Sequence, residues 1–186
     1  MSFEVLVIPE NPKKDRFILK PLVERMLLEC GKPNSRVVVP ERPHMNGYED
    51  ALRRLPEVLD EFAHVDLILF LVDADGKDRS AAFQRLEAQN VNLLCCAAKQ
   101  EIEVWLLAGH RDKLQLTWQQ VRDEVHVKDT VFQPFVTAHG DVGRYSGGRD
   151  LLMEQTLRNY RGLKRLCPEL EELEAKIRAR LEQMQS

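Results

Sequence analysis

Short apolar runs and amphipathic stretches alternate along the first hundred residues of the chain. Four runs rich in aliphatic, β-branched and aromatic residues predict buried strands, at residues 3–8, 36–40, 67–72 and 91–98. Between them, apolar residues recur at helical spacing and predict helices at residues 13–29, 48–63 and 79–89. Strictly alternating strands and helices indicate a parallel sheet with right-handed crossovers and helices on its faces. The expected fold class is therefore α/β, a Rossmann-like three-layer fold around a central, mainly parallel four-stranded sheet.

The second half of the chain has a helical pattern with one clear interruption. Residues 99–108 predict a helix whose core face carries Ile102, Trp105 and Leu106, and residues 118–125 predict a short one. Residues 138–149 are rich in glycine and predict a loop. From residue 150 to the end, the pattern predicts two packing helices separated at Cys167-Pro168. We expect a single domain over residues 1–186, with a core at 1–110 and a helical C-terminal extension at 111–186.

The leucine pattern of this extension predicts which side chains pack inward. The first of its two helices would present Leu151, Leu152, Leu157, Tyr160, Leu163 and Leu166 on one face. The second would present Leu170, Leu173, Ile177 and Leu181. These positions indicate packing rather than chemistry.

Composition and charge restrict the class of protein. Of 186 residues, 44% are hydrophobic and 31% are charged, which is typical of a globular protein. The net charge of −3 gives no bulk attraction to nucleic acid, so contacts to phosphate require a local basic patch or metal ions. No run approaches the length of a membrane span, and the four cysteines form no C-x-x-C pair, which favours reduced core cysteines and a cytoplasmic location.

Acidic residues follow two of the predicted strands. Asp73 and Asp75 come directly after the buried run at residues 67–72, and Glu10 follows the first strand after Pro9. Strand alternation would direct Asp73 and Asp75 to the same side, and carboxylates that lie close together repel each other unless a cation sits between them. The carboxyl ends of parallel strands are also where α/β sheets form their sites. These acids therefore predict a site for Mg²⁺ or Mn²⁺.

A single acid after a strand is often only a turn residue or a helix cap, and Asp15 and Asp78 are interpreted in this way. Glu103 differs, because it shares a helix face with Leu106 and Leu107 and so would lie beside apolar surface. A carboxylate in that position needs either exposure or a partner. Together with the three acids after strands, Glu103 favours the metal site.

Other templates fit the same residues less well. In the nucleophile motif of haloacid-dehalogenase-type phosphatases, Thr is expected where Lys77 stands. A phospho-receiver domain would have a lysine like Lys99 after its fourth strand, but usually paired acids after its first. The chain lacks the spacings of a calcium loop, a zinc site and a P-loop. Phosphate contacts are predicted at Lys99, which could instead cap its strand, and at Arg144 and Arg149, whose glycine-rich loop could instead be a mobile surface loop.

Several of these motifs resemble the Toprim domain, the metal-binding module of topoisomerases, primases and overcoming-lysogenization-defect nucleases. A strand ends in Glu10, Asp15 stands at the start of a helix, and a strand ends in Asp73-x-Asp75. Nearly the whole chain is similar to a family of small stand-alone Toprim-like proteins, found beside ATPase genes in phage-defence clusters. The segments that carry this similarity are Leu71 to Asp75, Glu101 to Ala108, Arg149-Asp-Leu-Leu and Cys167-Pro-Glu-Leu.

The resemblance implies roles for individual residues. Glu10 would be a metal ligand or a general acid/base, Asp73 and Asp75 would bind Mg²⁺, and Glu103 would help a second metal or orient the first. The chain has no room for the other domains of a topoisomerase or a primase, which leaves nucleolytic cleavage. A partner ATPase subunit is also implied, and an oligomer is compatible with it.

The sequence thus predicts a Toprim-like nuclease that hydrolyses phosphodiester bonds with Mg²⁺ or Mn²⁺, with DNA favoured over RNA as substrate. Two alternatives stay open. Asn11-Pro12 stands where Toprim proteins usually carry Gly, and this favours a non-catalytic module that binds metal and nucleic acid for sensing or assembly. The other alternative is a phosphatase that acts on small molecules.

Overall fold

The computed structural model describes residues 2–186 and has a parallel four-stranded sheet at its centre. The strand order is β2-β1-β3-β4, and all three pairings are parallel. The strands are β1 (Glu4–Ile8), β2 (Arg36–Val38), β3 (Leu67–Asp73) and β4 (Leu93–Ala98). The predicted α/β class with a parallel four-stranded sheet is confirmed.

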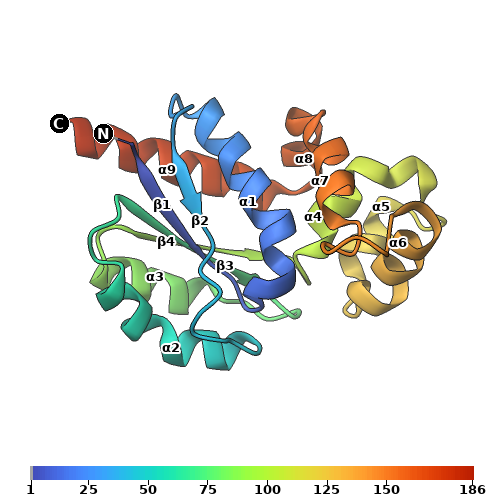
Figure 1. Ribbon diagram of the computed structural model, residues 1–186, viewed down its shortest axis with the longest axis horizontal. Coiled ribbons are helices and arrows are strands. Elements are labelled where there is room, and N and C mark those ends of the chain that lie inside the picture. The colour runs from blue at the N-terminus through green and yellow to red at the C-terminus, as the bar shows by residue number, and fades with distance from the viewer. Residues whose placement is uncertain (1) are drawn as a thin grey trace.

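Helices cover both faces of this sheet and make three layers (Figure 1). The crossover helices are α1 (Pro12–Glu29), α2 (Tyr48–Glu61) and α3 (Ser80–Gln89). Helix α1 and the last helix, α9 (Pro168–Gln185), pack on one face, whereas α2 and α3 pack on the other. Pro12 and Pro168 each stand in the first turn of a helix, where the missing N–H costs nothing.

Strand β3 shows why the two faces need separate cores. Leu67, Leu69 and Leu71 point into the core under α1 and α9, whereas Ile68, Phe70 and Val72 point into the core under α2 and α3. All six side chains are buried, as expected for a central parallel strand. At roughly 2 kcal/mol for each buried side chain, this strand contributes strongly to holding the layers together.

The segment after β4 differs from its prediction. The predicted helix at 99–108 begins only at α4 (Glu103–Leu107) and continues as the 3₁₀ helix η1 (Ala108–Lys113). The chain instead stays beside the end of β3 as far as Gln100, whose carbonyl accepts a hydrogen bond from the Asp75 N–H. The short helix α5 (Trp118–Asp123) matches its prediction, but the π-helix η2 (Lys128–Phe132) and α6 (Gln133–His139) were not predicted.

The C-terminal region also has one more helix than predicted. The loop covers only residues 140–148, and it is followed by α7 (Arg149–Leu157) and α8 (Tyr160–Leu166) before α9. The break before α8 occurs at Asn159, whose side chain caps the new helix by accepting a hydrogen bond from the Gly162 N–H. The packing predicted for Leu151 is wrong, since 42% of this residue is exposed.

The helices from α4 to α8 lie at the C-terminal edge of the sheet (Figure 1). They share one hydrophobic core with α1 and one face of the sheet, through residues such as Trp105, Val121 and Phe132. All four cysteines are free, and three of them are buried. Within residues 2–186, no helix is both long and apolar enough to cross a membrane.

Candidate metal and phosphate site

Adjacent strands bring Glu10 and Asp73 together, as predicted from their positions. Glu10 follows β1 and Asp73 is the last residue of β3, and these two strands are neighbours in the sheet. One carboxylate oxygen of Glu10 accepts a hydrogen bond from the Asp73 N–H at 3.0 Å. The contact joins the two strand ends and holds both acids at the carboxyl edge of the sheet.

Asp73 also fixes the start of α4. Its Oδ1 accepts a hydrogen bond from the Ile102 N–H at 2.8 Å, which places the residue between the end of β3 and the turn before α4. Ala74 and Asp75 donate their N–H groups to the carbonyls of Ala98 and Gln100. The β3 and β4 ends are therefore rigidly connected around this carboxylate.

Asp75 lies at the rim of the site. The strand ends at Asp73, so a turn rather than strand alternation sets the direction of Asp75. Asp75 and Gly76 both have positive φ, at 51° and 69°, a conformation that Asp and Gly tolerate better than other residues. The Asp75 side chain is 48% exposed, and its nearest basic contact is Arg79, at 3.8 Å.

Asp15 belongs to the same cluster, although its position in the sequence suggested only a helix cap. Its Oδ2 accepts a hydrogen bond from the Asn11 N–H at 2.9 Å, but Asp15 lies inside α1 and Asn11 is the N-cap, so the interpretation of Asp15 as a cap or a solvated turn residue is wrong. The residue is only 7% exposed, and its carboxylate feels the charges of Glu103 and Glu10. An acid in the first turn of a helix usually faces solvent, and nothing in the local pattern distinguishes this one.

Glu103 is almost completely buried, at 1% exposure, and its partner is Lys128. The Lys128 ammonium lies 3.4 Å from Glu103 Oε1, at an angle that leaves this oxygen without a hydrogen bond. The backbone N–H of Lys128 also donates to Glu101 Oε2 at 2.7 Å. The prediction that Glu103 needs a partner is confirmed, but the sequence did not identify the partner, since Lys128 comes from a π-helix 25 residues later.

Burial and mutual repulsion raise the pKa values of Glu10, Asp15 and Asp73. Burial raises the pKa of Glu10 to about 7, opposed by the hydrogen bond from Asp73 and increased by Asp75. Burial, with the charges of Glu10 and Glu103, raises the pKa of Asp73 to about 9. Burial and Glu103 raise the pKa of Asp15 to about 7. Burial alone would lower the pKa of Lys128, but the surrounding carboxylates outweigh it and raise this pKa.

The donors in this cluster are all oxygens, the ligand type that Mg²⁺ and Mn²⁺ prefer. Two buried oxygens near it, Glu103 Oε1 and Gln100 Oε1, have no hydrogen-bond partner. Within residues 2–186, however, no three acids, histidines or cysteines are already arranged as a metal cage. Lys128 supplies part of the positive charge that these carboxylates need.

The three basic residues predicted to contact phosphate have partners within the protein. Lys99 is exposed and pairs with Asp123 at 2.5 Å, and Arg144 pairs with Asp150 at 2.8 Å. Arg149 is only 6% exposed, with its guanidinium 5.0 Å from the Phe132 ring centroid. Their phosphate contacts stay a prediction.

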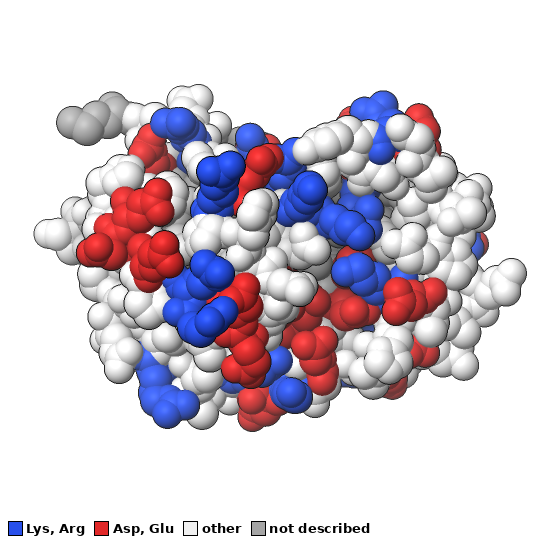
Figure 2. Space-filling model, turned by 60° about the horizontal axis from the view of Figure 1, so that its bottom comes forward, with Lys and Arg blue, Asp and Glu red and all other residues white. Residues whose placement is uncertain are grey.

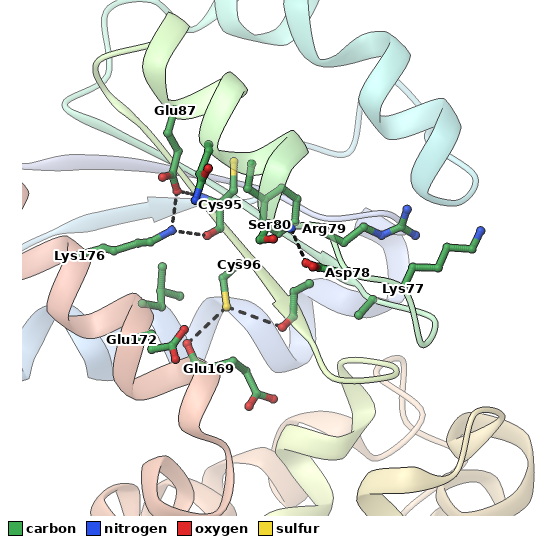
Figure 3. Close-up of a pocket in the computed structure, with 15 residues that line it drawn as sticks. Lys77, Asp78, Arg79, Ser80, Glu87, Cys95, Cys96, Glu169, Glu172 and Lys176 are labelled. Atoms are coloured by element: carbon green, nitrogen blue, oxygen red, sulfur yellow. Dashed lines mark hydrogen bonds and ion pairs between the residues drawn. The ribbon is translucent and has the colours of Figure 1, made fainter.

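A cavity of about 410 Å³ lies next to the site, between α3 and α9 along the free edge of β4. The Glu87 carboxylate accepts a hydrogen bond from the Cys95 N–H at 2.7 Å, and the Lys176 ammonium donates to the Cys95 carbonyl at 3.2 Å (Figure 3). These two side chains take the place of a neighbouring strand and block the sheet edge. Glu10, Asp73 and Glu103 do not line this cavity, whereas Lys77 and Arg79 do.

The face of the molecule in Figure 2 has no uniform sign of charge. Figure 2 shows a band of Lys and Arg side chains across one face, with groups of Asp and Glu beside it. This mixture agrees with the net charge of −3. A polyanion would therefore be attracted by local contacts or by bound cations rather than by a broad basic surface.

The raised pKa values predict that the protein loses stability as the pH rises. The folded state holds protons on Glu10, Asp15 and Asp73 that the unfolded chain has already released, so stability decreases from about pH 4 up to about pH 9. In EDTA, we expect the melting temperature to be roughly 5 °C lower at about pH 9 than at about pH 6, which corresponds to about 2 kcal/mol. Differential scanning fluorimetry at both pH values measures this difference, and Mg²⁺ should reduce it at the higher pH. A melting temperature that rises with pH would contradict the assignment.

Comparisons of the chain with protein-family models, with curated proteins and with solved structures find no match. The resemblance to the stand-alone Toprim-like proteins therefore stays a prediction.

Proposed function

We propose that this protein hydrolyses phosphodiester bonds of nucleic acid with the help of Mg²⁺ or Mn²⁺. The observation that carries this proposal is the buried acid cluster at the carboxyl edge of the sheet. Glu10, Asp73 and Glu103 repel one another there, with Lys128 as the nearest cation to Glu103. Holding these carboxylates close together raises the free energy of the folded state, which is hard to explain in a protein without a ligand for them. A divalent cation would remove much of this repulsion.

In this proposal the carboxylates have different roles. Asp73 and Glu103 would hold the metal, with Asp75 at the rim where a substrate enters. The metal would supply Lewis acidity to the phosphoryl group and to the attacking water. Glu10, with a pKa raised to about 7, is suited to accept a proton from that water near neutral pH.

Purified protein incubated with plasmid DNA and with a structured RNA tests the proposal. The reactions contain Mg²⁺, Mn²⁺ or EDTA, and Glu10→Gln serves as the variant because it keeps the size and the hydrogen-bond acceptor. We expect cleavage with metal, none in EDTA, and a loss of at least about 100-fold in the variant. Cleavage that persists in EDTA would exclude the mechanism, and the preferred substrate would distinguish DNA from RNA.

A non-catalytic module that binds nucleic acid is the second candidate. It is favoured by Lys128, because an ammonium beside Glu103 compensates charge without any metal. This candidate predicts binding of nucleic acid without turnover in any metal. The partner ATPase implied by the resemblance is also part of the proposal, and co-purification from cells would test it.

A further inference from the structure

Arg79 is placed at the acidic site as a cation whose hydrogen-bonding capacity is largely unused. Its nearest carboxylate is Asp75, and at 3.8 Å the contact is too long for a hydrogen bond. Its Nε–H is buried and has no partner. A guanidinium usually forms two parallel hydrogen bonds to a carboxylate, and this one does not.

The guanidinium is nevertheless held firmly. Its central carbon lies 3.5 Å from the centroid of the Tyr48 ring, a close cation–π stack, and the Arg79 side chain is only 11% exposed. Tyr48 is itself buried in the core on the α2 side of the sheet, where it contacts Phe70. The stack therefore fixes the plane of the guanidinium before any ligand arrives.

The position of Arg79 relative to the acids suggests what it binds. It follows the turn after β3 and its charge reaches Glu10 as well as Asp75. In Figure 3, Arg79 and Lys77 lie at the end of the cavity opposite Lys176, so two basic side chains stand together beside the acidic rim. A phosphate group in contact with the proposed metal would carry oxygens that a fixed guanidinium could bind in pairs.

We propose that Arg79, braced by Tyr48, binds the non-bridging oxygens of a backbone phosphate at the rim of the acidic site. This inference rests on the proposed function, since it names the group that positions the nucleic acid there. The competing explanation is that Arg79 only balances the charges of Asp75 and Glu10. The two explanations differ in what happens to binding of nucleic acid, not in what happens to stability.

The test is the binding of a fluorescent single-stranded DNA oligonucleotide, measured by anisotropy in Ca²⁺ at several salt concentrations. We expect Arg79→Ala to weaken binding by about tenfold and to reduce the salt dependence by about one phosphate contact. Arg85→Ala is the matched control, because Arg85 is exposed on α3, the helix that begins directly after Arg79, and its effect should stay within about twofold. Equal binding by the two alanine variants overturns the proposal, as does a wild-type protein that binds no oligonucleotide.

Two further variants keep the test valid if Arg79→Ala folds poorly. Arg79→Lys keeps the charge but not the paired donors, and it should weaken binding by at least about threefold. Tyr48→Phe keeps the aromatic ring and should bind the oligonucleotide as wild type does. This variant distinguishes the contribution of the ring stack from that of the hydroxyl group. Binding that depends on Arg79 without any cleavage in Mg²⁺ or Mn²⁺ would remove the nuclease but keep this inference. Cleavage that is unaffected in Arg79→Ala would keep the nuclease but remove this inference.

Discussion

Asp73→Asn should abolish nucleic-acid cleavage and, at the same time, make the folded protein more stable. The amide oxygen can still accept the hydrogen bond from the Ile102 N–H, so the turn before α4 is kept. The negative charge is lost, however, and the site then no longer binds a divalent cation tightly. We expect cleavage to decrease by at least about 10³-fold, equivalent to about 4 kcal/mol of transition-state stabilisation.

The gain in stability follows from the raised pKa of Asp73. Burial and the charges of Glu10 and Glu103 disfavour the ionised form, so a neutral side chain relieves the folded state above neutral pH. In EDTA at about pH 8, we expect the melting temperature of Asp73→Asn to exceed that of wild type by a few degrees. A variant that is both inactive and less stable would indicate that Asp73 is a structural residue.

Asp78→Asn provides the matched control for this experiment. Asp78 is an exposed residue of the turn after β3, and its Oδ1 accepts a hydrogen bond from the Ser80 N–H at 2.9 Å. The same chemical change a few residues away should therefore alter neither cleavage nor the melting temperature appreciably. Together the two variants distinguish the effect of losing a charge at the site from the effect of losing a charge a few residues away.

Lys128→Met should destabilise the protein because it leaves Glu103 buried without its cation. The pair is 3.4 Å apart, with the glutamate side chain 2% exposed and the lysine side chain 29% exposed. Removing one partner of a buried pair costs more than removing a surface pair, and we expect about 2 kcal/mol after allowing for the partial exposure of Lys128. This corresponds to a decrease in melting temperature of roughly 4–8 °C.

Mg²⁺ should compensate for the missing ammonium. We expect the divalent cation to raise the melting temperature of Lys128→Met by more than it raises that of wild type, since the variant lacks the built-in counter-ion. Lys99→Met is the control, because Lys99 forms an exposed pair with Asp123 and should cost less than about 1 kcal/mol. A Lys128→Met protein with unchanged stability, with and without Mg²⁺, would mean that the cluster is not electrostatically strained.

The sequence determined the architecture of the sheet and part of the site. Apolar runs with turn residues after them located all four strands and the three crossover helices, because a parallel strand buried on both faces must be apolar throughout. Because the strands are parallel, their carboxyl ends meet at one edge of the sheet. That rule was enough to predict that Glu10 and Asp73 approach each other.

Tertiary structure decided which charges complete the site. Asp15 and Lys128 have ordinary local patterns, and they join the cluster only because α1 follows β1 directly and η2 packs against α4. The non-helical segment before α4 depends on the hydrogen bond from the Asp75 N–H to the Gln100 carbonyl. The additional helix α8 depends on the hydrogen bond from the Gly162 N–H to the Asn159 side chain. Periodicity reports which side of an element is buried, but it carries no information about which distant side chain will lie opposite. The identity of the cation beside Glu103 was therefore settled by packing alone.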